Sequence, residues 1–226
     1  MRDRYLRNAQ ALSEADQGLL ASKRALVVGC GGLGGYVIEC LARIGVGKLR
    51  LVDKDVFEVS NLNRQLFSSE MNLGKPKVLA AQHRVMAINP LIEVEAVFSR
   101  FEDTDALALL DTCDVVVDAL DNIPSRLRLQ QYCKEAEITL VHGAVAGWRG
   151  QICVIRPGED LLNILYGSST QETGEEKRVG TLSFSPAVVG ALEAAEVVKL
   201  LLAKPTMMRE LLSIDLLHGK FERVKF

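Results

Sequence analysis

The residues best suited to chemistry in this sequence are glycines, cations and carboxylates of the kinds that hold a nucleotide. Gly29, Gly31 and Gly34 have the G-x-G-x-x-G spacing that is typical of a phosphate-binding turn between a strand and a helix. One glycine makes the tight turn, one admits backbone N–H groups to the phosphate, and one lets the helix pack close to the strand. Asp53 lies about 20 residues further on, where a carboxylate that binds ribose is expected.

The cations and a further carboxylate favour a triphosphate over a dinucleotide. A dinucleotide carries about two negative charges, which backbone amides and a helix terminus can hold. A triphosphate carries about four, and its transfer needs Lys, Arg and a carboxylate-held Mg²⁺. Arg64, Lys75 or Lys77, and Asp121 supply that set. We therefore favour ATP over NAD. The residues after Ile155 are also too few for the substrate domain that a dehydrogenase would need.

Apolar runs that alternate with helical patterns predict the elements that position these residues. They indicate a Rossmann-like α/β fold with a mostly parallel sheet, helices on both faces, and antiparallel strands added on the C-terminal side. Strands are expected at 25–28, 49–52, 92–98, 114–122, 138–141, 150–155, 212–216 and 221–226. Helices are expected at 33–44, 75–88, 103–110 and 124–136, with a further long apolar helix over 188–203 that Ser185-Pro186 would cap.

We expect residues 1–226 to form a single domain in four parts. Residues 1–22 would be an N-terminal helical extension, with a helix starting near Ser13. Residues 23–156 would be the nucleotide-binding core. Residues 157–181 would be a polar crossover loop, and 182–226 a helix followed by a C-terminal hairpin.

Five short motifs occur in an order that resembles the ThiF–MoeB–HesA family, bacterial relatives of the ubiquitin-activating enzymes. The motifs are Gly29-Cys30-Gly31-Gly32-Leu33-Gly34, Asp53-Lys54-Asp55, Asn61-Leu62-Asn63-Arg64-Gln65, Gly74-Lys75-Pro76-Lys77 and Asp118-Ala119-Leu120-Asp121-Asn122. Arg4-Tyr5-Leu6-Arg7 is similar to the family's N-terminal arginine motif. The resemblance implies a homodimeric adenylyltransferase that uses ATP and Mg²⁺. It would activate the C-terminal glycine carboxylate of a small ubiquitin-like sulfur carrier ending in Gly-Gly, giving an acyl-adenylate and pyrophosphate.

The resemblance also implies roles for individual residues. Asp53 would hold the ribose, Asp121 would hold Mg²⁺, and Arg7 would reach the triphosphate of the neighbouring subunit. Apart from the resemblance, the small residues 143–147 would let another backbone approach closely, so we expect them to accept the carrier's tail. The implied catalytic residues are Arg7, Arg64, Lys77 and Asp121. The implied nucleotide-binding residues are Gly29, Gly31, Gly32, Gly34, Asp53, Asp55, Asn61, Arg64, Gln65, Lys77, Leu120 and Asn122.

The cysteines mark a departure from the family pattern. The sequence has five cysteines and no Cys-x-x-Cys pair, so we expect a member without structural zinc. No cysteine follows Cys153, which argues against a covalent step in the crossover loop. We expect the cysteines to be reduced residues of the core. Cys30 is the one candidate for a reactive thiol, because a helix N-terminus can lower the pKa of a cysteine. His83, His142 and His218 are expected to be structural or on the surface, because a carboxylate nucleophile needs no general base.

Composition narrows the class of protein further. The net charge of −2 gives no basic footprint for nucleic acid, and no stretch is typical of a signal peptide or a membrane span. We therefore expect a cytoplasmic protein. Three alternatives stay open at this point: adenylation of a carboxylate on modified tRNA, a Rossmann-type NAD(P) protein, and a scaffold that binds nucleotide without turnover.

Overall fold

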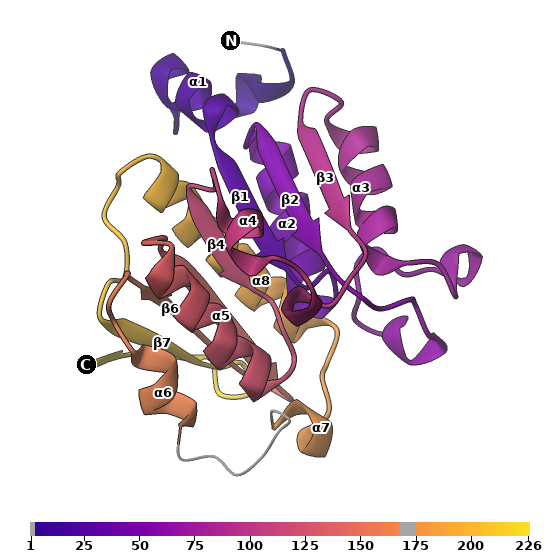
Figure 1. Ribbon diagram of the computed structural model, residues 1–226, viewed down its shortest axis with the longest axis vertical. Coiled ribbons are helices and arrows are strands. Elements are labelled where there is room, and N and C mark those ends of the chain that lie inside the picture. The colour runs from indigo at the N-terminus through magenta and orange to yellow at the C-terminus, as the bar shows by residue number, and fades with distance from the viewer. Residues whose placement is uncertain (1–2, 168–174) are drawn as a thin grey trace.

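The computed structural model describes residues 3–167 and 175–226, and within them the strands form one eight-stranded sheet (Figure 1). The order is β3-β2-β1-β4-β5-β6-β7-β8, and the first five of these strands run parallel. The last three each pair antiparallel with the strand before. The strands are β1 (Arg24–Val28), β2 (Lys48–Val52), β3 (Glu93–Val97), β4 (Val115–Asp118), β5 (Leu140–Ala146), β6 (Arg149–Ile155), β7 (Glu210–Asp215) and β8 (Lys220–Lys225).

Helices cover both faces of this sheet, as the sequence predicts. The α-helices are α1 (Glu14–Ser22), α2 (Gly32–Ile44), α3 (Lys77–Ile88), α4 (Ala106–Leu110), α5 (Ile123–Glu135), α6 (Leu161–Tyr166), α7 (Glu176–Val179) and α8 (Phe184–Leu201). Short 3₁₀ turns are η1 (Asp3–Asn8), η2 (Val59–Asn61), η3 (Glu70–Asn72) and η4 (Phe101–Asp103). One core joins α2, α3 and α8 to the sheet, and a second joins α4, α5 and α6 to its other face.

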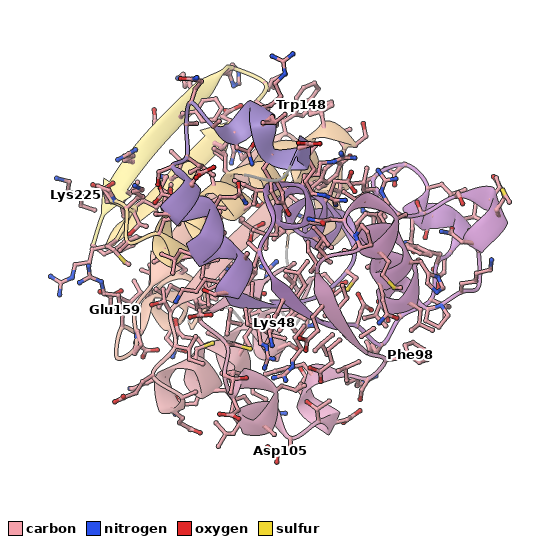
Figure 2. All side chains as sticks on the ribbon, turned by 90° about the horizontal axis from the view of Figure 1, so that it is seen from above. Lys48, Phe98, Asp105, Trp148, Glu159 and Lys225 are labelled. Carbon is pink, nitrogen blue, oxygen red and sulfur yellow. The ribbon has the colours of Figure 1, made fainter. Side chains whose placement is uncertain are left out.

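Burial on both faces explains why the central strands are continuous apolar runs rather than alternating ones. On β4, Val115 and Val117 face the first core, whereas Val116 faces the second. The edge strands lie far apart. In Figure 2, Phe98, just after β3, and Lys225, on β8, lie on opposite sides of the molecule.

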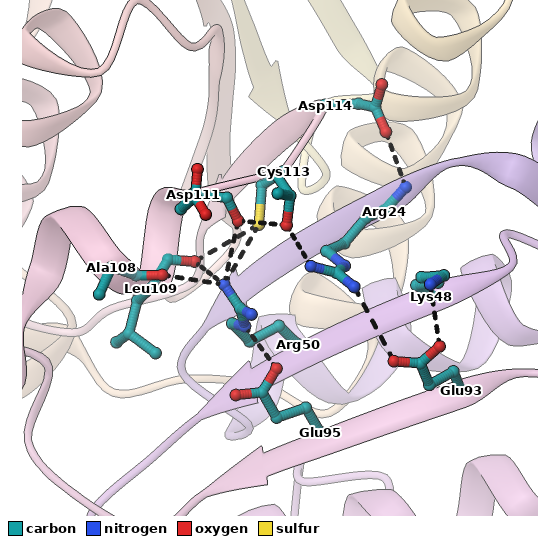
Figure 3. A network of polar contacts seen from close by, with 11 residues as sticks. Arg24, Lys48, Arg50, Glu93, Glu95, Ala108, Leu109, Asp111, Cys113 and Asp114 are labelled. Carbon is teal, nitrogen blue, oxygen red and sulfur yellow. Dashed lines mark hydrogen bonds and ion pairs between the residues drawn. The ribbon is translucent and has the colours of Figure 1, made fainter.

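Charged side chains lie over β2 and β3 on the face of the sheet that the short helix α4 covers (Figure 3). Arg50 on β2 pairs with the directly opposite Glu95 at 2.7 Å, and Lys48 pairs with Glu93 at 3.0 Å. Arg50 also donates to carbonyl oxygens at the end of α4, including that of Ala108 at 3.3 Å. These bonds satisfy helix carbonyls that have no partner within the helix. Charges along an edge strand also discourage pairing with another chain.

The predicted helices and strands are present, but two of them are shorter than expected. The strand expected over 114–122 ends at Asp118, which leaves Asp121 and Asn122 in a loop, and the helix expected over 103–110 begins at Ala106. There are four further differences. The helix expected from Lys75 begins at Lys77. The strand expected at 138–141 continues to Ala146, because its small residues pair with β6. Ser185 does not cap α8; it lies inside the first turn, where its hydroxyl donates to the carbonyl of Gly147 at 2.7 Å.

The fourth difference lies in the crossover segment, which the sequence predicted to be a loop. It contains α6 and α7 on either side of residues 168–174, and those seven residues lie outside the described part of the chain. Among the described residues, no helix combines the length and the apolar character needed to cross a membrane.

Candidate nucleotide-binding site

A cavity of about 900 Å³ opens at the carboxyl ends of the parallel strands, around the point between β1 and β4 where the strand order reverses. Ligands of open α/β sheets bind at this switch point, and the volume suits a small-molecule site. Most of the residues expected to hold a nucleotide line it. They are Gly29, Gly31, Gly32, Asp53, Asp55, Arg64, Gln65, Lys77, Leu120, Asp121 and Asn122.

The glycine turn between β1 and α2 has the geometry that its spacing predicts. Gly29 has φ +100°, and a Cβ there would lie 2.5 Å from the carbonyl oxygen of Ala119. A Cβ on Gly34 would lie 1.8 Å from the carbonyl oxygen of Gly29, so this glycine serves helix–strand contact and does not line the cavity. Gly31 and Gly32 border the cavity, where backbone at a helix N-terminus can approach an anion.

Asp53, at the end of β2, holds the glycine turn together. Its carboxylate accepts backbone N–H groups from Cys30 and from Asp55, each at 2.7 Å. Burial raises the pKa of Asp53, and these two hydrogen bonds oppose that rise. The carboxyl group lines the cavity from the side of β2, the position expected for a contact to ribose.

Lys77 places a buried positive charge in the wall of the same cavity. Its side chain is 7% exposed, and its ammonium nitrogen lies 3.1 Å from a carboxylate oxygen of Asp55. The backbone N–H of Lys77 also donates to the carbonyl of Asp55 at 2.9 Å. Two bonds therefore fix this cation where α3 begins, and it needs little rearrangement to meet a phosphate.

The polar loop after Asp55 was expected to contribute Asn61, Arg64 and Gln65 to the cavity, and only the last two line it. Arg64 and Gln65 line it, and the buried Oε1 of Gln65 has no hydrogen-bond partner among the described residues. Such an atom is costly to leave unpaired, so it indicates a missing donor from a ligand or water. Asn61 is buried away from the cavity, where its Oδ1 accepts the backbone N–H of Glu58 at 3.1 Å. Its contact with phosphate therefore stays a prediction without support from this geometry.

The loop after β4 brings three expected residues to the other side of the cavity. Asn122 caps α5 by accepting the backbone N–H of Ser125 at 2.9 Å. The N–H of Leu120 donates to Asp118, and its carbonyl accepts from Arg126. Asp121, between Leu120 and Asn122, is exposed and has no hydrogen bond or ion pair with any residue that the structure describes. Its carboxylate is thus available to a metal ion.

The sequence reading missed several cavity residues. Arg126 is 4% exposed on the first turns of α5, and Arg128 and the segment 99–103 after β3 also line the cavity. Arg126 donates to the carbonyl of Leu120 at 3.2 and 2.7 Å. Its place just after the switch-point strand was a usable signal. The segment after β3 had none, because its residues carry no motif.

The structure places Cys30 in the core, as expected for the cysteines in general, and does not support the alternative of a reactive thiol. Its thiol is buried, and burial raises its pKa well above the usual range, aided by the nearby carboxylate of Asp53. A helix N-terminus does not produce a thiolate when the sulfur points into the core. All five cysteines are free thiols, and Cys30 is not the reactive one that the sequence suggested.

Arg7 lies far from the cavity of its own chain. Tyr5, two residues before it, packs on Gly45 just beyond the C-terminal end of α2, whereas the glycine turn is at the N-terminal end. A helix of 13 residues is about 20 Å long, which an arginine side chain cannot span. Figure 1 shows the N-terminal segment at the amino end of the sheet. Arg7 is exposed there and can reach only a different site.

A second unpaired group is buried behind the cavity, on α8. Glu193 is fully buried, and neither of its carboxyl oxygens has a hydrogen-bond partner among the described residues. A Cβ on Gly143 would lie 2.4 Å from the carboxyl carbon, so this glycine makes room for the acid. The space over Gly143 is therefore not available to a carrier's tail. Burial raises the pKa of Glu193 well above its usual range, with the charge of Asp118 adding to the effect.

Glu193→Gln is expected to remove a pH-dependent cost to stability. A carboxyl with a raised folded-state pKa binds a proton that the unfolded chain releases, so folding stability falls as pH rises from about 4.5. The amide cannot ionise, so the variant should gain stability relative to wild type between pH 5 and 8, measured by thermal unfolding. Glu196, one turn on, is the control because it is satisfied by Lys199 and by the backbone N–H of Met207. Glu196→Gln should destabilise the protein, and equal effects from both variants would contradict this account.

No group of three or more His, Cys, Asp or Glu is placed to hold a metal ion within residues 3–167 and 175–226. A magnesium ion bound with a nucleotide does not need one, since phosphates and water supply most of its ligands. A single carboxylate such as that of Asp121 fits this kind of site.

Fold and site together define a Rossmann-type nucleotide-binding protein with an antiparallel extension. The sequence matches the ThiF family over residues 5–226, so the chain belongs to the ThiF family. This confirms the family and the fold class indicated by the sequence.

Among proteins with similar sequences is the SAMP-activating enzyme E1 of Haloferax volcanii, 36% identical over 99% of this chain and 85% of its own length. The sulfur carrier protein adenylyltransferase of Thermus thermophilus is 37% identical over 98% of this chain and 86% of its own. The molybdopterin-synthase adenylyltransferase of Escherichia coli is 36% identical over 82% of this chain and 75% of its own length. A crystal structure of E. coli MccB with succinimide shares the fold, with a TM-score of 0.83, 23% identity, and coverage of 100% of this chain and 72% of MccB.

Proposed function

We propose that this chain is an ATP-dependent adenylyltransferase that activates the C-terminal carboxylate of a small ubiquitin-like sulfur carrier. Family membership and the functions for which the similar proteins are named support this class of enzyme and of partner. The observation that carries the proposal is the cavity at the switch point. There the glycine turn, the buried cation of Lys77 and the exposed carboxylate of Asp121 line one space that suits a nucleotide.

The proposed reaction requires no general base. A carboxylate oxygen of the carrier attacks the α-phosphorus of ATP, and the bond from that phosphorus to the bridging oxygen breaks. Pyrophosphate leaves with the electron pair. The barrier comes from bringing two anions together, so the cations of Arg64 and Lys77 lower it by neutralising the phosphates. Mg²⁺ would be held by Asp121 and would screen the same charge.

We further propose a homodimer in which Arg7 completes the partner's site. A two-fold interface uses each patch reciprocally, so one arm can serve each active site. The distance between Arg7 and the cavity of its own chain supports this arrangement, because a role in catalysis then requires a second subunit.

The proposed activity is tested by ATP–pyrophosphate exchange with purified carrier proteins that end in Gly-Gly. Exchange should require the carrier, Mg²⁺ and ATP, and it should vanish when the final glycine of the carrier is deleted. NAD should not compete with ATP for the site. Exchange that needs tRNA in place of a carrier, or none with any carrier, would contradict the proposal.

The purified protein is expected to contain no stoichiometric zinc. The sequence has no Cys-x-x-Cys pair, and among the described residues no group of three or more His, Cys, Asp or Glu is placed to hold a metal ion. Elemental analysis of protein purified without chelator should give well under one zinc per chain. One zinc per chain that survives gel filtration would contradict this expectation.

A further inference from the structure

A chain of buried polar groups connects the end of α6 to the loop that carries Asp121. Nδ1 of His142 lies 2.7 Å from a carboxylate oxygen of Asp118, and Nε2 lies 3.0 Å from the hydroxyl of Tyr166. Gln151 on β6 also donates to that hydroxyl. His142 and Asp118 are fully buried. The network was not visible in the sequence, because its members come from four separate elements.

The bonding pattern assigns the protons in this chain. The other oxygen of Asp118 accepts the backbone N–H of Leu120 at 3.0 Å, so Asp118 acts as an acceptor and His142 donates from Nδ1. Burial lowers the pKa of His142, so its ring is neutral near pH 7 and Nε2 accepts from Tyr166. The Tyr166 hydroxyl then accepts from Gln151. Every donor along the path has an acceptor, which favours one fixed arrangement.

Arg126 closes the network at the other backbone group of Leu120, its carbonyl. It donates twice to the carbonyl of Leu120 and once, at 3.5 Å, to the hydroxyl of Tyr166. Its guanidinium also lies 5.7 Å from the centre of the Tyr166 ring. The N–H of Leu120 is thus held through Asp118 and its C=O through Arg126. Asp118, through His142, and Arg126 directly both connect Leu120 to the hydroxyl of Tyr166. Asp121 is the residue that follows Leu120.

We propose that Tyr166 is a positioning residue for the adenylation site, acting through His142, Asp118 and Arg126 to fix the Leu120–Asp121 peptide. This inference rests on the proposed function for its consequence in catalysis, because Asp121 is there the magnesium ligand. Tyr166 touches no reacting group. Its hydroxyl sets the direction of the two side chains that hold the loop, and so the direction in which the Asp121 carboxylate enters the cavity.

Tyr166→Phe tests the inference because it removes the hydroxyl and keeps the ring on Arg126. In the variant, the Leu120 amide should exchange its hydrogen faster, while amides within β4, such as that of Val117, keep their protection. The kcat of ATP–pyrophosphate exchange should fall about fivefold to tenfold, as expected for one lost buried hydrogen bond. The Mg²⁺ concentration for half-maximal rate should rise, with the KM for ATP little changed. Tyr132→Phe on α5 is the matched control, since its ring packs on Phe101 outside the network, and it should behave as wild type.

Three results would decide against the inference. Unchanged protection at Leu120 in Tyr166→Phe overturns it, and so does an equal loss of protection throughout β4, which would indicate general destabilisation. An unchanged Mg²⁺ requirement in an active variant overturns it as well. If wild-type protein catalyses no exchange with any carrier, the proposed function fails. Hydrogen exchange on the ligand-free protein then still supports or overturns the positioning role.

Discussion

Asp121→Asn should reduce carrier-dependent ATP–pyrophosphate exchange by roughly 10³-fold or more, with little change in stability. An amide oxygen is a much weaker ligand for Mg²⁺ than a carboxylate oxygen, and the metal supplies several kcal/mol of transition-state stabilisation. The fold should survive, because the side chain is exposed and has no partner among the described residues. Exchange rates over a range of Mg²⁺ concentrations, with thermal unfolding on the same samples, measure both effects.

Asp103 provides the matched control for this substitution. It also presents an exposed carboxylate to the cavity, but it follows β3, two strands away from the switch point. A general loss of negative charge in the cavity would affect both variants alike. Asp103→Asn is therefore expected to keep most of the wild-type exchange. Near-normal exchange in Asp121→Asn, or equal losses in the two variants, would remove Asp121 from its proposed place as metal ligand.

The sequence predicted many of the residues that line the switch-point cavity, because these residues lie close to the ends of strands. Gly29, Asp53 and Asp121 each follow an apolar run, and parallel strands bring their carboxyl ends to one edge. No structure is needed to infer that these residues meet.

The parts that sequence reading missed depend on contacts between distant elements. Cys30 has a helix N-terminus beside it in the sequence, yet only packing decides that its sulfur faces the core. Glu193 fits an amphipathic helix pattern, but Gly143, on another element, makes space for it. His142 and Tyr166 are 24 residues apart and share no motif. Periodicity describes one element at a time, so it cannot predict such pairs.

Arg7→Ala is expected to be nearly inactive although Arg7 cannot reach the cavity of its own chain. A cation supplied by a partner to a phosphoryl reaction is worth roughly 10³-fold or more in rate. The arm that carries Arg7 is firmly anchored. The hydroxyl of Tyr5 accepts from Asn89 at 2.7 Å, and a Cβ on Gly45 would collide with the tyrosine ring. The variant should therefore fold and bind ATP normally, and lose mainly kcat.

Mixing two inactive variants tests whether Arg7 acts across an interface. Arg7→Ala and Asp121→Ala should each show almost no exchange alone and recover activity when their subunits are allowed to reassort. About half of the dimers would then be mixed, each with one intact site and one site lacking both residues, so activity should approach a quarter of wild type per site. Lys48→Ala is the control for Arg7→Ala. Lys48 is also a cation at the amino end of the sheet, but it lies outside the proposed site, so this variant should be active without mixing. If subunits demonstrably exchange and activity stays at the level of the separate variants, Arg7 does not complete the partner's site.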